Sequence, residues 1–221
     1  MFALYPNCIR VIDPRTALVM VLGVAFVMAL AAVLQFRGAQ AAPPPPGLDH
    51  VRAFAKDLLV REEYADAIAA YLFIAQQAPQ DARAQYEYAG TLGFLRMFTE
   101  AVPAIERAIM LDPNNTLYWE FAAMALQQIS QHDKAFAATE RGAELGDVNA
   151  MFSLAGLHEH GRGTSVSKEK ALQWLERAAS AGHLSAMDVM RRVYAEGLYE
   201  QAPNSARAAQ WAERLHRETN R

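Results

Sequence analysis

The longest uninterrupted apolar stretch of the chain lies near its N-terminus. Residues 17–34 read ALVMVLGVAFVMALAAVL and include no charged side chain. About 20 apolar residues in a helix span the hydrocarbon core of a bilayer. Arg15 and Arg37 flank the stretch, and their long side chains can reach the headgroups on either side. The pattern predicts an N-terminal tail over 1–16 and a single transmembrane helix over 17–36.

A cleaved signal peptide is the alternative interpretation of the same stretch. Ala39-Gln40-Ala41 has the small-x-small form of a cleavage site. The apolar cores of signal peptides are about 7–15 residues long, however, and this stretch is longer. We therefore expect the helix to be retained as an anchor.

The orientation of this helix is only weakly indicated by charge. The tail carries Arg10 and Arg15, and the other side carries Arg37, Arg52 and Lys56. Because positive residues favour the cytoplasmic side, the nearly equal counts give a narrow preference for a cytoplasmic N-terminus.

A proline-rich linker over residues 37–47 follows the apolar stretch and contains Pro43–Pro46. Consecutive prolines adopt an extended, stiff polyproline II conformation. We expect this linker to hold the following domain away from the membrane.

Beyond the linker, the pattern of apolar and small residues repeats every 34 residues. The recurring positions are Leu58, Leu92 and Leu126, then Ala67, Ala101 and Ala135, then Pro79 and Pro113. A period of this length is typical of paired antiparallel helices, in which alanines allow close packing and prolines end each second helix. The phrase Ala108–Asn115 and this period resemble the tetratricopeptide repeat. The resemblance implies three such repeats over 48–145.

After residue 145 the period lengthens. The recurring pairs are Gly146–Ala150 with Gly182–Ala186, Gly161 with Gly197, and Trp174 with Trp211. They resemble the Sel-like repeat, a longer-looped relative of the tetratricopeptide unit, and imply two such repeats over 146–217. Tyr199 stands in the second copy where the first has Gly163, so we expect that loop to differ while its helices persist. The five repeats together predict an all-α solenoid of ten helices with a concave face.

Charge and cysteine content exclude several classes of function. The net charge is −3, and residues 1–47 carry three arginines against one aspartate, so the remainder carries −5. Proteins that bind nucleic acid rely on basic surfaces, and we expect no such partner. Cys8 is the sole cysteine, which excludes an intrachain disulfide and a Cys-x-x-Cys-His haem attachment.

No group of residues has the form of a catalytic or cofactor site. Gly161-Arg162-Gly163 reads as a turn between helices. His158 and His160 flank Glu159, but residues two apart on a helix point in different directions. His158 also matches Tyr194 in the next repeat, which predicts core packing instead of metal binding. The tryptophans predicted to pack in the core are Trp119, Trp174 and Trp211. We expect no enzymatic activity, metal or cofactor.

The tetratricopeptide resemblance implies a partner-binding concave face on the first helix of each repeat. The candidate residues at the lining positions are Arg52, Lys56, Leu59, Arg83, Tyr86, Phe94, Glu120, Met124 and Gln127. They lack the full Lys/Asn pattern of family members that clamp a C-terminal carboxylate. We expect a protein partner here, and the alternative is a face that is only solvated.

The N-terminal stretch carries a second resemblance. Tyr5, Ile9–Ile12, Asp13–Val19 and Phe26–Leu30 are similar to the α polypeptide of purple-bacterial core light-harvesting rings, including the turn Asp13-Pro14-Arg15. The family's pigment-ligating histidine would fall near residue 33, where this chain has valine. The resemblance implies a helix without that ligand, which retains at most non-covalent pigment or lipid contacts. It also implies a bacterial inner, photosynthetic membrane with a cytoplasmic N-terminus and periplasmic repeats.

These observations lead to two functional hypotheses. In the first, the chain is a non-catalytic membrane-anchored scaffold that serves as an accessory α-like subunit of a photosynthetic light-harvesting–reaction-centre complex, with subunits of that membrane complex as partners. In the second, it is a general inner-membrane envelope scaffold or chaperone-like adaptor for translocation, cytochrome maturation or complex assembly.

Overall fold

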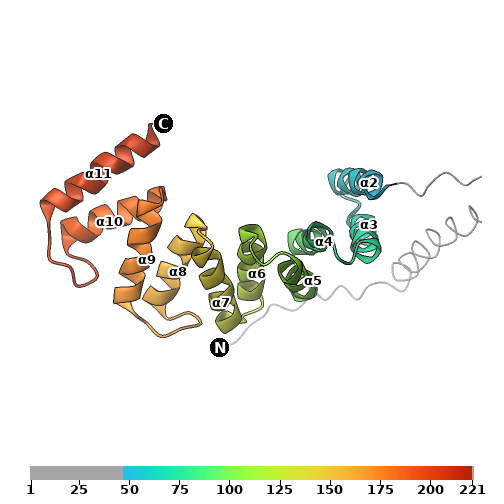
Figure 1. The fold of residues 1–221 in the computed structure, drawn as a ribbon, viewed down its shortest axis with the longest axis horizontal. Coiled ribbons are helices and arrows are strands. Elements are labelled where there is room, and N and C mark those ends of the chain that lie inside the picture. The colour runs from blue at the N-terminus through green and yellow to red at the C-terminus, as the bar shows by residue number, and fades with distance from the viewer. Residues whose placement is uncertain (1–46, 221) are drawn as a thin grey trace, which may run out of the picture. The chain divides into compact units, whose positions relative to one another are not determined.

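A computed structural model describes residues 47–220 (Figure 1). The predicted tail over 1–16, the membrane helix over 17–36, the turn Asp13-Pro14-Arg15 and nearly all of the proline-rich linker lie outside the described residues. Within 47–220, no helix is both long enough and apolar enough to cross a membrane. The described part of the chain contains ten α-helices and no strand, as the repeat pattern predicts.

The chain forms two compact units, which divide between Ala78 and Pro79. The described part of the first unit is a helix pair, α2 (Leu48–Val60) and α3 (Tyr64–Gln77), which pack against each other. Leu58 of α2 and Ile74 of α3 are among its buried residues.

The second unit is a series of four helix pairs. They are α4 (Ala82–Phe94) with α5 (Phe98–Leu111), α6 (Thr116–Gln128) with α7 (His132–Glu144), α8 (Val148–His160) with α9 (Lys168–Ser180), and α10 (Leu184–Glu196) with α11 (Ser205–Thr219). Each helix packs against the next along the chain (Figure 1). A solenoid of helix pairs therefore builds this unit.

Side-chain caps begin the first helix of every pair in the second unit. The capping residues are Asp81, Asn115, Asp147 and His183, each of which accepts a hydrogen bond from a backbone N–H in the first turn of its helix. Such a cap satisfies a donor that has no partner inside the helix, and it stabilises the helix by about 1 kcal/mol. The recurrence of these caps explains why the helix starts follow the repeat period.

The turn between the two helices of a pair contains a residue in the left-handed region. In the pairs with the 34-residue period, this residue is Glu62, Arg96 or Ser130, with φ between 60° and 63°. In the last two pairs, it is Gly161 or Gly197. Glycine adopts this conformation without strain, whereas another residue pays about 1–2 kcal/mol for it.

Replacing Ser130 with glycine is therefore expected to stabilise the protein. The gain should be about 0.5–1 kcal/mol, because relief of strain is partly offset by the greater freedom of glycine in the unfolded chain. Urea unfolding followed by circular dichroism measures the change. Ser130→Ala is the control and should give no gain, since alanine keeps the strain.

Two hydrophobic clusters form the interior of the second unit. One includes Ile105 and Leu126 and extends over α4–α7, and the other includes Leu154 and Met190 and extends over α7–α11. Many members are alanines, which let the helix backbones approach closely. The two clusters meet at α7, so each repeat is stabilised mainly by its neighbours.

The loop between α8 and α9 lies directly against the start of α7. Gly163 has φ +71°, and a Cβ atom there would lie 2.2 Å from the carbonyl oxygen of His132. Its counterpart Tyr199 also has a positive φ, of 52°, and Glu200 beside it has 62°. The loop between α10 and α11 thus keeps a left-handed backbone without the glycine. The two helices that it joins persist as expected.

Candidate partner-binding pocket

An open pocket of about 680 Å³ lies within the second unit. We call it the α6–α8 pocket, because α6, α7 and α8 supply nearly all of its lining. From α6 come Leu117, Glu120, Phe121, Ala123, Met124 and Gln127; from α7 come His132, Ala135, Ala138, Thr139 and Gly142; and from α8 come Asn149, Ala150, Ser153, Gly156, Leu157 and His160. Tyr86 of α4 and Arg162 of the following loop complete it.

Small side chains form the buried wall of the pocket. Ala135, Ala138 and Gly142 of α7 and Ala150 of α8 are all buried. Thr139 is buried as well, and its hydroxyl donates to the Ala135 carbonyl at 2.9 Å, so it has no unmet polar group. A group bound against this wall would therefore be held by close fit and by apolar contacts.

Larger apolar side chains line the pocket beside this wall. Leu117 is 54% exposed and Met124 is 41% exposed. The ring of Phe121 meets that of Tyr86 edge-on, with centroids 6.0 Å apart. Exposed apolar side chains gathered in a concavity are typical of a surface that another molecule covers.

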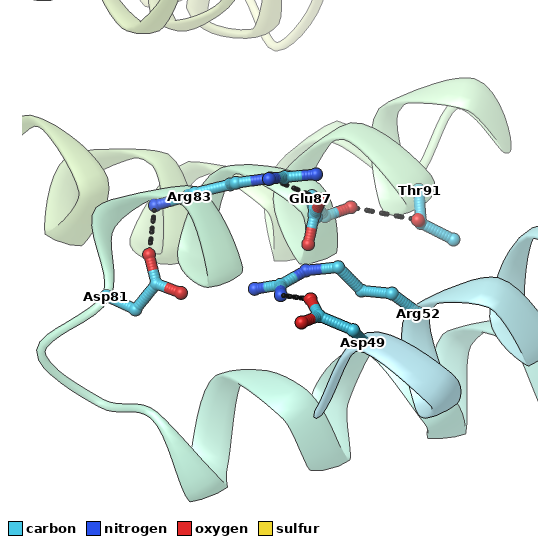
Figure 2. Close-up of polar contacts among 6 residues, drawn as sticks. All are labelled: Asp49, Arg52, Asp81, Arg83, Glu87 and Thr91. Carbon is cyan, nitrogen blue, oxygen red and sulfur yellow. Dashed lines mark hydrogen bonds and ion pairs between the residues drawn. The ribbon is translucent and has the colours of Figure 1, made fainter. Parts of the chain in front are cut away.

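Four of the nine candidate residues line this pocket. They are Tyr86, Glu120, Met124 and Gln127. Arg83 and Phe94 lie on α4 but do not line it. Figure 2 shows why Arg83 is held elsewhere: its Nε donates to Glu87 at 2.9 Å, and its backbone N–H donates to the capping Asp81. The neighbouring Thr91 hydroxyl donates to the Glu87 carbonyl (Figure 2).

The other three candidates, Arg52, Lys56 and Leu59, belong to α2 in the first unit. Within that helix Arg52 forms an ion pair with Asp49 at 3.0 Å (Figure 2). Lys56 is exposed and Leu59 is partly buried. None of the three lines the α6–α8 pocket.

Several lining residues were not among the sequence candidates. Asn149, Ser153, Gly156 and His160 lie on α8, the first helix of the next pair. Counted from the start of α8, the same helix positions fall on Asn149, Gly156 and His160, but not on Ser153. Gly156 is a second signal of a binding surface. A glycine inside a helix lowers the stability of the protein. Packing does not require it here, because nothing lies within 4 Å of where its Cβ would be.

The next first helix, α10, presents a different surface. Arg191 pairs with Asp188 at 2.9 Å, and Arg192 pairs with Glu196 at 3.3 Å. No residue of α10 lines the pocket. These ion pairs occupy part of the α10 surface, and the α6–α8 pocket does not extend to that helix.

His158 is buried in the core of the C-terminal repeats, as the repeat alignment predicts. It is 3% exposed and packs edge-on against Phe136. Burial, with a smaller effect from Lys170, lowers the pKa of His158. Its Nδ1 has no hydrogen-bond partner, whereas the equivalent Tyr194 hydroxyl accepts from Arg207 at 3.1 Å. Within residues 47–220, no three His, Cys, Asp or Glu side chains are grouped to hold a metal ion.

The cap of α10 should make stability depend on pH. Nδ1 of His183 accepts from the Ala186 N–H at 3.1 Å, and the ring stacks on Phe152. Burial lowers the pKa of His183, and only the neutral ring can accept at Nδ1. Because the folded pKa is below the unfolded value of about 6.5, stability is complete above pH 6.5 and falls as acidification proceeds below it.

We expect His183→Asn to reduce this acid sensitivity, since asparagine caps a helix without titrating. Urea unfolding at pH 7.5 and pH 5.5 should show a smaller loss in the variant than in the wild type. A pH-independent cost from the lost stacking on Phe152 would appear equally at both values. An unchanged loss on acidification would show that His183 is not a source of the dependence.

Comparison with known proteins identifies the repeat type at the C-terminal end. Residues 148–183 and 192–215 match the Sel1 repeat family. These matched segments of the last two helix pairs are similar to Sel1 repeats. The match covers α8, α9 and parts of α10 and α11. No curated protein matches the chain significantly.

Several solved structures share the fold. A Sel1 repeat protein from Oxalobacter formigenes is 22% identical, with a TM-score of 0.54, over 69% of this chain and 64% of that chain. MamA from Desulfovibrio magneticus RS-1 is 16% identical, with a TM-score of 0.55, over 80% and 97%. YrrB, described as a TPR protein with an unusual peptide-binding site, is 20% identical, with a TM-score of 0.52, over 77% and 85%. These similarities establish the TPR-like helical-repeat fold.

Proposed function

We propose that the chain is a protein-interaction scaffold whose α6–α8 pocket holds an extended segment of a partner protein. The carrying observation is the pocket itself, with exposed Leu117 and Met124 beside a wall of small buried residues. Helical-repeat proteins present such concave surfaces to partners. The peptide-binding site named for YrrB, which shares the fold, supports the same use here. No catalytic step is part of the proposal.

Gly156 supports an extended occupant. Its side-chain position faces open space in the pocket wall, and Ala123 of α6 is also small. A helix surface without side chains lets the backbone of another chain approach closely. The pocket is large enough for a few side chains, so we propose that a short segment of the partner, and not its whole surface, occupies it.

Replacing Met124 with glutamate is expected to weaken partner binding at least ten-fold, because it places a charge against apolar groups of the partner (about 1.4 kcal/mol or more). Tagged full-length protein is recovered from its native cells, and the amount of co-purified partner is quantified. Met110→Glu is the matched control, since Met110 on α5 is 74% exposed and outside the pocket. Equal recovery with both variants would contradict the proposal.

We also propose that residues 17–36 anchor the scaffold in a membrane, with the N-terminus cytoplasmic and the repeats periplasmic. The uncharged run over 17–34 and the flanking arginines support this. A membrane-impermeant maleimide should label Cys8 only in permeabilised cells. In a Cys8→Ser background, it should label Ser165→Cys without permeabilising the inner membrane. A mature N-terminus at Ala42 would show instead that the helix is a removed signal.

The most specific part of the proposal is a place in a photosynthetic light-harvesting–reaction-centre complex. It rests on the resemblance of the tail and membrane segment, including Asp13-Pro14-Arg15, to light-harvesting α polypeptides. Purified native photocomplexes should contain the chain. Its absence from them, with co-purification of a translocation or cytochrome-assembly factor, would favour the general envelope scaffold.

A further inference from the structure

One end of the α6–α8 pocket is lined by three side chains whose N–H groups can donate hydrogen bonds to an anion. His132 begins α7, His160 ends α8, and Arg162 follows in the next loop. All three are exposed. Glu120, the acidic residue of the lining, is about 10 Å from Gln127 along α6, toward the start of that helix, given the 1.5 Å rise per residue. The pocket therefore has a cationic end beside its apolar middle.

Arg162 differs from most arginines of the second unit. Arg83 and Arg192 pair with a glutamate four residues away, and Arg177 lies 4.1 Å from the centroid of the Trp174 ring. Within the described residues, the guanidinium of Arg162 has no carboxylate, carbonyl or aromatic partner. A guanidinium binds carboxylates in a planar, two-pronged geometry, which this one is free to offer to another molecule.

The loop holds the Arg162 backbone in a defined position. Gly161 ends α8 in the left-handed conformation, and the Arg162 N–H donates to the Leu157 carbonyl at 3.1 Å. Gly163 lies against the backbone of His132. Since both flanking residues are fixed, the backbone under this guanidinium needs little ordering when a partner binds.

Among residues 47–220, no neighbouring carboxylate forms an ion pair with Arg162. Glu159 lies 4.0 Å from the Nδ1 of His160, but it hydrogen bonds with the Tyr199 hydroxyl and does not line the pocket. Asp133 is beside His132 in sequence and also lies outside the lining. The second unit, residues 79–221, carries fifteen Lys and Arg against eighteen Asp and Glu, a formal −3. Arg162 therefore lies in a unit whose net charge is negative.

We propose that the segment bound in the α6–α8 pocket carries an acidic side chain, which Arg162 binds while an adjacent apolar side chain of the segment contacts Met124. This rests on the proposed peptide-binding function and adds the chemistry of the peptide. The positive charge of Arg162 favours an acidic group in the segment. Because Arg162 is exposed, we expect the bound segment to be able to continue past it, as an internal acidic side chain requires.

Random peptides displayed on phage, with their C-termini joined to the coat protein, are selected on the full-length protein. We expect selected peptides to carry Asp or Glu at a fixed spacing from a large apolar residue. The end-blocked synthetic peptide should bind Arg162→Glu about ten-fold more weakly than wild type, which is about 1.4 kcal/mol. Lys134→Glu, the control on exposed α7 surface outside the pocket, should bind within about two-fold. Replacing the peptide's acidic residue with lysine should restore binding to Arg162→Glu.

The outcomes separate this inference from the proposed function. Suppose that the peptides lose binding to Met124→Glu but show no preference for acidic residues and bind Arg162→Glu as tightly as wild type. This result would overturn only the proposal of an acidic side chain. Peptides that bind Met124→Glu as tightly as wild type would overturn the pocket as the binding site. If only a second library, displayed with free C-termini, yields binding peptides, the carboxylate belongs to a chain end and the proposal of an acidic side chain is overturned.

Discussion

Replacing Gly163 with alanine is expected to lower the free energy of unfolding by about 3 kcal/mol or more. Its φ of +71° alone costs a residue with a side chain about 1–2 kcal/mol. The added Cβ would also lie 2.2 Å from the oxygen and 2.7 Å from the carbon of the His132 carbonyl. These are backbone atoms inside a helix, so they cannot move aside as a side chain would. Urea unfolding followed by circular dichroism measures the loss.

Two other glycines provide matched controls for Gly163→Ala. Gly146 has φ +97° with nothing within 4 Å of its Cβ position, so Gly146→Ala should cost only the backbone strain of about 1–2 kcal/mol. Gly156 is helical and open, so Gly156→Ala should stabilise by about 0.5–1 kcal/mol. A cost for Gly163→Ala no larger than for Gly146→Ala would show that the loop does not press on α7.

The second large effect is expected from Leu154→Ala, which should cost about 2–5 kcal/mol. Leu154 is completely buried in the cluster over α7–α11. Truncation removes its apolar contacts and leaves a cavity that the surrounding helices fill only in part. Leu184→Ala, at a 44% exposed position on α10, is the control and should change stability by less than about 0.5 kcal/mol.

The location of the damage in Leu154→Ala tests the repeat architecture. Stability in a helical-repeat array comes from each repeat and its nearest neighbours. Native-state hydrogen exchange should therefore show that amides of α8–α11 lose more protection than those of α4–α6, whose buried residues belong to the other cluster. Equal loss in both regions would indicate one cooperative core instead.

The repeat period predicted the fold well because the same local packing and helix-ending signals recur in each repeat. Ala67, Ala101 and Ala135 are all buried where helices meet, and α3 and α5 end two residues before Pro79 and Pro113. Each of these signals acts within one repeat. For this reason, helix number and pairing could be inferred without any knowledge of tertiary contacts.

The candidate pocket could be predicted only in part. Met124 and Gln127 follow from positions on the first helices of the repeats. His132 and Arg162 do not, because they meet through the contact between Gly163 and α7, which joins residues 31 apart in sequence. Nothing local marks that contact except a glycine between helices. The candidates on α2 follow the same first-helix rule as Met124, yet they belong to the first unit and do not line this pocket.

Site-specific photocross-linking tests the central claim that the α6–α8 pocket holds a protein partner. Benzoylphenylalanine is introduced in place of Met124 or of Met110 in the full-length protein in its native cells. We predict one discrete adduct from position 124, which the peptide selected on the wild-type protein suppresses, and no such adduct from position 110. The same adducts from both positions, or an adduct from position 110 alone, would contradict the account.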